Sequence, residues 1–185
     1  MLGFSVEPLI ENMGVFYYVL VYGIGVLAIS LSVFAFQLKY RTAIIICSFS
    51  GQTAWVAHFL LQGDLTSAIV CSFSAVVLML FSKKEKWPWT THPLMLVLFI
   101  LIFVGLSALS FKVWSDIFPP LAGVFLVIAN SRETEKRLRQ FSFFYCIFWL
   151  MNSTFKMYPI AFASDFLCAV STVVGLIRYR EKKAD

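Results

Sequence analysis

The chain has 185 residues, of which 60% are hydrophobic and 14% are charged, and its formal net charge is +5. A soluble domain of this size would leave much of that apolar composition facing water, so the composition excludes a soluble monomer and indicates a membrane protein. The mean hydropathy of +0.84 agrees. The positive charge is dispersed over short segments between apolar runs, which favours membrane topology signals over nucleic-acid binding.

Seven apolar runs are each about long enough to cross the hydrocarbon core of a bilayer as a helix. They are Val15–Gln37, Thr42–Gln62, Leu65–Ser82, Pro93–Phe111, Val113–Asn130, Leu138–Lys156 and Tyr158–Ile177. Strands of a membrane barrel would be shorter and would alternate polar with apolar residues, whereas these runs are apolar on every face. The sequence therefore predicts an all-α membrane protein with seven transmembrane helices, folded as a single membrane domain over residues 1–185.

The distribution of charge predicts the orientation of these helices. The segment before the first run carries Glu7 and Glu11 but no Lys or Arg, unlike a signal peptide, so we expect the first run to be retained. Of the 15 Lys and Arg residues, 13 lie in the loops after runs one, three and five or in the C-terminal tail, which are all on one side of the membrane. The other two, Lys112 and Lys156, lie on the opposite side. The positive-inside rule then predicts an outer N-terminus and a cytoplasmic C-terminus.

Two parts of the chain, 37–84 and 130–182, follow the same plan. In each, a basic loop leads to a helix with a central Trp, a short outer loop and a helix that ends in basic residues. Trp55-Val-Ala-His58 matches Trp149-Leu-Met-Asn152, and Cys71 matches Cys168. Because each repeat has three crossings, parallel repeats need one extra crossing between them. We therefore predict repeats at about 15–84 and 113–182, joined by an apolar linker helix at about 92–111 that faces lipid, a 3+1+3 plan.

Four stretches carry a resemblance to known families: Gly23–Ala28, Phe36–Lys39, Trp55–Gly63 and Ile177–Arg180. Through them the chain resembles the YgjV-type bacterial inner-membrane proteins and, more distantly, the SWEET/MtN3/PQ-loop group. The resemblance implies a bacterial inner-membrane location, a periplasmic N-terminus, a SWEET-like fold and transport. The Pro-Gln pair of the PQ-loop group is replaced by Phe36-Gln37 and Ala129-Asn130, with prolines instead at Pro119-Pro120.

The same resemblance implies substrate contacts from the second and third helices of each repeat. Trp55 and Trp149 match the second-helix positions, while Cys71 and Cys168 fall where SWEET-type sites have an Asn. A thiol is a weaker hydrogen-bonding group than an amide, so sugar specificity does not carry over. The four cysteines otherwise have no metal or CxxC spacing, and inert buried thiols are their default interpretation.

Polar side chains within the runs should face a central cavity, because lipid penalises them. They are Gln52, His58, Ser67, Ser72, Ser74, Ser142, Asn152, Thr154, Asp165, Ser171 and Thr172. Trp55 and His58 are three residues apart and share one helical face, as do Trp149 and Asn152, so we expect two matching faces around a substrate pocket. The alternatives are interfacial anchoring for Trp and helix packing for the Ser, Thr and His residues.

Asp165 is the one acid well inside a predicted run. A carboxylate at that depth could carry a proton that is coupled to transport. The alternative is that it is wetted from the outer end or paired with Lys156.

The leading hypothesis is a small-solute transporter that works by alternating access between the two repeats, with an unknown solute. The alternative is a membrane receptor or scaffold on the same fold, in which Lys83–Lys86 and Arg132–Arg139 bind a partner. No motif of an enzyme or a phosphate site is present, so we expect no catalytic residue, cofactor or metal. The expected partners are the bilayer and a small molecule, without nucleic acid, and homo-oligomerisation is left open.

Overall fold

The computed structural model describes residues 11–132 and 134–178, and every regular element in that part of the chain is helical. The long helices are α2 (Val15–Gln37), α3 (Arg41–Leu61), α4 (Leu65–Ser82), α5 (Pro93–Ser110), α6 (Phe118–Ser131), α7 (Glu135–Phe155) and α8 (Pro159–Arg178). Two short 3₁₀ helices, η1 (Pro88–Thr91) and η2 (Trp114–Ile117), precede α5 and α6. Glu7, Arg180, Lys182 and Lys183, which entered the topology prediction, lie outside the described residues.

The helix boundaries follow from local capping. Asp64 caps α4 by accepting from the Ser67 amide at 3.1 Å and from the Ser67 hydroxyl at 2.8 Å, and Thr134 caps α7. Proline occupies the first turn of α5 and of α6, where its missing N–H has no intrahelical partner to lose.

Most helix boundaries lie within three residues of the sequence prediction, and the start of α6 differs most. The fifth run was expected to be helical from Val113, but α6 begins at Phe118 and is 14 residues long, because η2 fills the preceding segment and Pro119 and Pro120 fix the start of the helix. At 1.5 Å per residue, α6 spans about 21 Å, which is less than a hydrocarbon core of about 30 Å.

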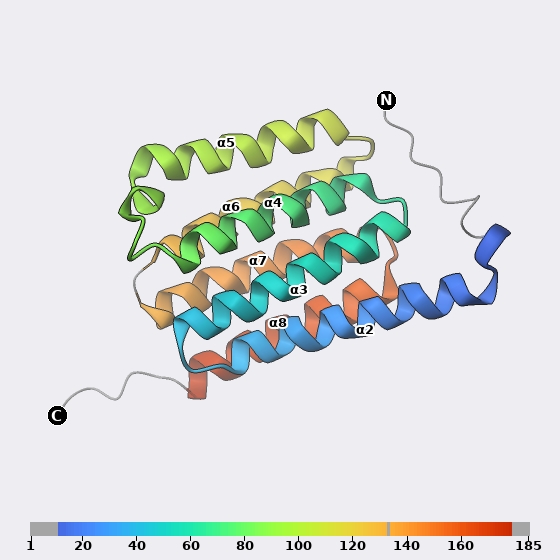
Figure 1. Ribbon diagram of the computed structural model, residues 1–185, viewed down its shortest axis with the longest axis horizontal. Coiled ribbons are helices and arrows are strands. Elements are labelled where there is room, and N and C mark those ends of the chain that lie inside the picture. The colour runs from blue at the N-terminus through green and yellow to red at the C-terminus, as the bar shows by residue number, and fades with distance from the viewer. Residues whose placement is uncertain (1–10, 133, 179–185) are drawn as a thin grey trace.

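The helices form two layers (Figure 1). α2, α3 and α4 make one layer in sequence order, and α8, α7 and α6 lie behind them. The layers touch along their edges, where α2 contacts α8 and α4 contacts α6. α3 and α7 therefore occupy the middle of their layers and face each other across the centre of the molecule.

α5 lies against the edge formed by α4 and α6 (Figure 1). Its buried residues are Phe99, Phe103 and Ser107, and the rest of its surface is exposed or partly exposed. Gly123 permits this contact, since a Cβ at that position would overlap the Phe103 ring. α5 thus presents an almost entirely apolar surface away from the bundle, as a lipid-facing helix does.

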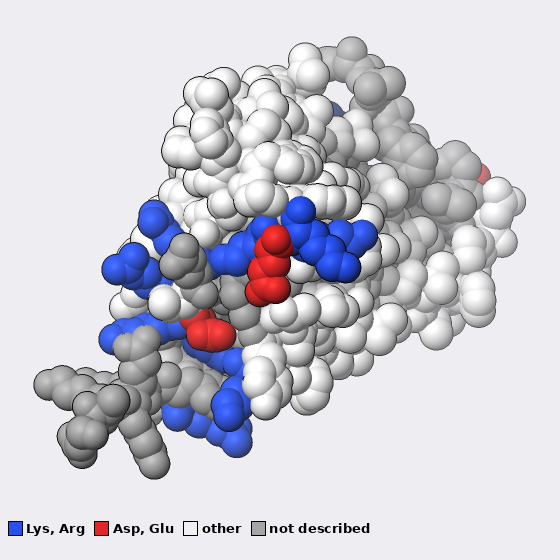
Figure 2. Space-filling view, turned by 60° about the vertical axis from the view of Figure 1, so that its left-hand side comes forward, with Lys and Arg blue, Asp and Glu red and all other residues white. Residues whose placement is uncertain are grey.

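Charge separates the two ends of the bundle. The loops that follow α2, α4 and α6 lie at the same end of the bundle as the last residues of α8. Figure 2 shows Lys and Arg side chains gathered at this end. The described basic residues at this basic end include Lys39, Lys83, Lys84, Lys86, Arg132, Lys136, Arg137 and Arg178. The opposite end holds the turns after α3, α5 and α7, with Lys112 and Lys156.

Five of the described helices are long and apolar enough to cross a membrane: α2, α3, α4, α5 and α8. α6 is short, and α7 begins with the charged residues Glu135, Lys136, Arg137 and Arg139. Large apolar side chains such as Val19, Leu101 and Leu167 are exposed on the outer faces of these helices. The chain is therefore a multi-pass membrane protein with an all-helical fold.

Candidate functional site

A small cavity lies between the two layers, at their centre. Its volume is about 50 Å³, and both layers contribute to its wall. The lining side chains are Ser32, Ile44, Ser48, Gln52, Trp55, Leu78, Leu126, Asn130, Leu138, Ser142, Tyr145, Cys146, Ser164, Asp165 and Cys168. Asn130 and Leu138 are close to the basic ends of α6 and α7, whereas Gln52, Trp55 and Asp165 are deeper in the bundle. More than half of these side chains carry a polar atom, which is unusual at the centre of a membrane protein.

A second void of about 20 Å³ continues this cavity towards the opposite end. Gln52, Trp55, Tyr145 and Asp165 border both spaces, while Phe59, Cys71, Trp149 and Ala161 border only the second. The two spaces thus form one seam between α3 and α7, with four shared side chains at its middle. We refer to this seam as the central cavity.

A direct hydrogen bond crosses the central cavity. The amide nitrogen of Gln52 on α3 donates to the hydroxyl of Tyr145 on α7 at 2.5 Å, and this bond joins the two layers. The Gln52 side chain is 7% exposed, and its carbonyl oxygen has no partner among the described residues. Trp55 Nε1 donates to the Ser32 hydroxyl of α2 at 3.1 Å, so this indole is held within its own layer.

Asp165 carries the one carboxylate that borders the central cavity. It lies on α8, about 9 Å along the axis from the start of the helix at Pro159. Its Oδ2 accepts from the Ser153 hydroxyl of α7 at 2.5 Å. The alternative that Asp165 pairs with Lys156 is wrong, because both ion pairs of Lys156 in the described part of the chain go elsewhere.

Aromatic rings separate the central cavity from the end opposite the basic one. The Phe59 ring stacks on Trp149 of the other layer, with ring centres 5.8 Å apart and planes 12° apart. It also stacks on Trp55, at 5.4 Å and 25°. All three side chains are buried, so the stack joins α3 to α7 and closes the space between them on this side.

The structure brings together some of the predicted site residues and not others. Trp55, Trp149, Cys71, Cys168 and Asp165 all border the central cavity. Cys71 and Cys168 belong to opposite layers, and all four cysteines of the chain are free thiols. These residues were predicted to line one space, and the structure places them around it.

His58 and Asn152 are buried but border neither part of the central cavity. His58 Nδ1 donates to the carbonyl of Val21 at 3.1 Å and thereby packs α3 on α2. Gly25 makes room for the imidazole, since a Cβ there would lie 3.0 Å from His58 Cε1. Asn152 is 1% exposed, and its amide atoms have no hydrogen-bond partner among the described residues.

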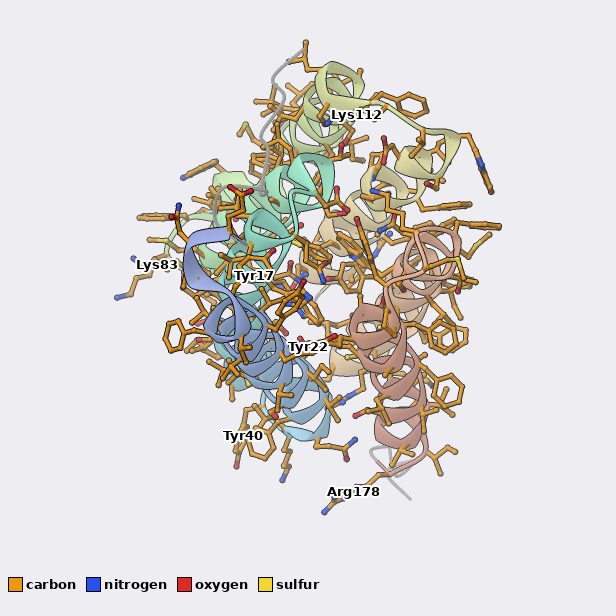
Figure 3. The ribbon with its side chains drawn as sticks, turned by 90° about the vertical axis from the view of Figure 1, so that its right-hand side faces the viewer. Tyr17, Tyr22, Tyr40, Lys83, Lys112 and Arg178 are labelled. Carbon is orange, nitrogen blue, oxygen red and sulfur yellow. The ribbon has the colours of Figure 1, made fainter. Side chains whose placement is uncertain are left out.

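A cluster of three charged side chains lies at the end opposite the basic one. Lys156 Nζ is 2.8 Å from Asp116 Oδ1 and 3.0 Å from Asp64 Oδ2. The side chains of Lys156, Asp64 and Asp116 are 10%, 4% and 3% exposed. Since Lys156 follows α7, Asp64 precedes α4 and Asp116 precedes α6, the cluster ties both layers together. Figure 3 views the molecule from this end, where Lys112 is labelled beside the two layers.

Backbone groups also stabilise this cluster. Asp116 Oδ2 accepts from the amides of Lys112 at 2.7 Å and Val113 at 3.0 Å. Burial by itself would raise the pKa of the Asp116 carboxyl, but the bond to Lys156, the two amide bonds and the Lys156 charge together hold it below its ordinary value. Asp116 is therefore the anionic partner of Lys156 at neutral pH.

At the basic end, polar contacts again join the layers. The Gln37 amide of α2 donates to the Ser171 hydroxyl of α8 at 2.5 Å. Arg139, counted by sequence among the loop cations, is instead 1% exposed, and its guanidinium donates to the Leu38 carbonyl at 2.6 Å. The central cavity is thus bounded by contacts between the layers at both ends.

Several of these residues were not predicted. Tyr145 lies four residues before Trp149 and so shares its helical face, a spacing visible in the sequence. Asp64, Asp116 and Lys156 come from three separate turns, and no local spacing reveals that they meet.

The profile of the Imp-YgjV family, described as a bacterial inner membrane protein, matches residues 19–183. The chain belongs to this family. The match covers most of the chain and confirms both the YgjV resemblance and the location in the bacterial inner membrane. No curated protein and no solved structure matches the chain.

Proposed function

We propose that this YgjV-family protein is a small-solute transporter that works by alternating access between its two layers. The observation that carries the proposal is the central cavity, a polar space between α3 and α7 that is bordered by Gln52, Tyr145 and Asp165. Polar groups are expensive at membrane depth and are retained there mainly where a polar ligand or water must be accommodated.

The layer arrangement supports a 3+1+3 plan with α5 as the linker. α2 and α6 run in one direction, as do α3 and α7, and α4 and α8 (Figure 1). A half-turn about the long axis of the bundle would exchange α2 with α6 and α8 with α4. The contact between α2 and α8 at one edge would then be equivalent to the contact between α6 and α4 at the other edge. In this proposal α2 to α8 are seven crossings, with bilayer thinning around the short α6.

The size of the central cavity indicates which step of a transport cycle the structure represents. Ligand sites usually measure about 300–1,000 Å³, whereas the two parts of this cavity have volumes of about 50 and 20 Å³. This volume holds a few water molecules. The two layers must therefore move apart before a solute can enter, and we assign the structure to an occluded state.

Thiol labelling tests the proposal. Cys168 borders the central cavity, so a variant that keeps Cys168 as its one cysteine reports access to that space. We expect a membrane-impermeant methanethiosulfonate reagent to reach it from either face of oriented vesicles. Cys47, which borders no part of the cavity, is the matched control. Access from neither face would favour the receptor or scaffold alternative, in which the cavity is a static packing defect.

We also propose that the basic end is cytoplasmic and the end with Lys156 is periplasmic, following the positive-inside rule. A phosphatase fused after Asp185 should then be inactive, while a fluorescent protein at the same place should fold and emit. The reverse result would contradict this orientation.

A further inference from the structure

We infer that the central cavity binds a small primary ammonium group, with Asp165 as its counter-ion and Gln52 as a second hydrogen-bond acceptor. The inference rests on the proposed function and names the class of solute.

The side chains that border the central cavity include an acidic residue and no basic residue. Asp165 is the one residue with an ordinarily charged side chain among those bordering the central cavity. The other titratable groups that face it are Cys71 on α4, Tyr145 and Cys146 on α7, and Cys168 on α8, all of which are ordinarily neutral at pH 7. No cation of the described chain is paired with Asp165, since Lys156 is shared between Asp64 and Asp116. Asp165 is partly buried at membrane depth, where a carboxylate without a counter-ion is unfavourable, so a bound monovalent cation would complete this site.

The hydrogen-bond acceptors of Asp165 and Gln52 favour a cation that carries N–H donors. Asp165 receives one hydrogen bond, from Ser153, and so retains acceptor positions. The Gln52 side chain borders the same space, and its carbonyl oxygen has no partner among the described residues, while its amide nitrogen is bound to Tyr145. An ammonium group with three N–H donors fits two such acceptors better than a quaternary ammonium does, which has none.

Aromatic side chains supply the rest of the wall. Trp55, Tyr145, Phe59 and Trp149 border the cavity around Gln52 and Asp165. The π face of an aromatic ring attracts a cation, and Trp does so most strongly. The carbon atoms of an alkylammonium ion would also pack on these rings, so the cavity combines an ionic site with an apolar one.

Protection of Cys168 from alkylation tests this inference. Cys168 lies three residues from Asp165, hence on the same face of α8, and borders the same cavity. We measure the rate at which neutral iodoacetamide alkylates the single-cysteine Cys168 variant in detergent. The reaction is run in the presence of ethylammonium chloride, of ethanol as its neutral isostere, of tetramethylammonium chloride, or of sodium chloride. We expect ethylammonium to slow the reaction and the other three to have little effect.

Variants of the cavity residues show which side chains bind ethylammonium. In Asp165→Asn the concentration of ethylammonium needed for half-protection should rise at least about thirtyfold, the loss typical when one partner of a buried charge pair is removed. Gln52→Leu should also weaken protection. Asp165→Glu, which keeps the charge, should retain it in part, and Glu85→Gln, which removes an exposed carboxylate at the basic end, should leave it unchanged.

A second measurement uses the chain with all its cysteines. A ligand that binds the folded state raises the melting temperature, so ethylammonium should stabilise the wild type but not Asp165→Asn. Equal protection by ethanol, sodium or tetramethylammonium, or full protection in Asp165→Asn, would overturn the inference. Ammonium binding is measured without transport, so the two proposals can fail separately. If ethylammonium does not bind, Cys168 can still be labelled from both faces of the membrane. If Cys168 cannot be labelled from both faces, ethylammonium can still bind.

Discussion

Phe59 and Trp149 stack across the centre of the bundle, with ring centres 5.8 Å apart and planes 12° apart. One ring belongs to α3 and the other to α7, so this contact joins the middle helices of the two layers. It lies between the polar part of the central cavity and the end that carries Lys156. In the proposed cycle, this stack and the Lys156 cluster together keep that side closed, and both must separate when it opens.

Phe59→Ala should open the central cavity towards the Lys156 end. Cys71 borders the same part of the cavity as Phe59, so its alkylation from that face of the membrane should become faster. Loss of the buried ring should also destabilise the fold by about 3–5 kcal/mol. Phe166→Ala, at an exposed ring on α8, is the matched control. An unchanged rate at Cys71 would show that Phe59 does not close the cavity.

Lys156→Met should lower the stability of the fold strongly. The substitution leaves Asp64 and Asp116, which are 4% and 3% exposed, without their cation. Removing one partner of a buried ion pair typically costs about 3–5 kcal/mol. Thermal unfolding in detergent measures the effect, with Lys112→Met, an exposed lysine at the same end, as the control. Equal melting temperatures for the two variants would contradict the structural role of the cluster.

The contribution of Asp116 should depend on pH in a defined direction. Its pKa lies below the ordinary value in the folded state, because the Lys156 bond, the two amide bonds and the Lys156 charge outweigh the effect of burial. Its stabilising effect is therefore complete above the ordinary aspartate pKa of about 3.9 and is lost as the pH falls through the lower native value. The wild type should melt above Asp116→Asn at pH 7, and the difference should shrink below about pH 4. A difference that stays constant down to pH 3 would exclude this linkage.

Two glycines of α2 provide a matched pair. Gly25→Ala would place a Cβ 3.0 Å from His58 Cε1 and 3.1 Å from Ile160 Cγ2, whereas nothing lies within 4 Å of a Cβ at Gly23. We expect Gly25→Ala to destabilise the fold by about 1 kcal/mol or more through overpacking. Gly23→Ala should stabilise it by about 0.5–1 kcal/mol, because Ala is the better helix former. Melting temperatures that change equally would show that α2 and α3 are not in close contact at Gly25.

The sequence predicted the fold as far as local patterns determine it. Long apolar runs and basic loops located the helices because lipid imposes both features on any spanning segment. The start of α6 was predicted wrongly, since Val113–Ile117 is apolar enough to extend the run, while Pro119 and Pro120 favour a helix that begins at Phe118. Apolarity alone did not reveal that boundary.

The candidate site was predictable only in part. Trp55 and Trp149, which are central aromatic residues of apolar runs, both border the central cavity. His58 shares a helix face with Trp55 yet packs on Val21, since the width of a helical face allows neighbours three residues apart to contact different helices. The meeting of Lys156 with Asp64 and Asp116 depends on how three turns are arranged in space, which no local spacing encodes.

Distance measurements between spin labels test the central claim, the alternation between two layers, most directly. One label pair at Leu60 and Met157 spans the layers at the Lys156 end, and a second at Thr42 and Lys136 spans them at the basic end; all four side chains are exposed. In lipid, each pair should show two populated distances, and Lys156→Met should lengthen the first pair while shortening the second. A single distance at each end, unchanged by Lys156→Met, would contradict alternating access and support a static scaffold.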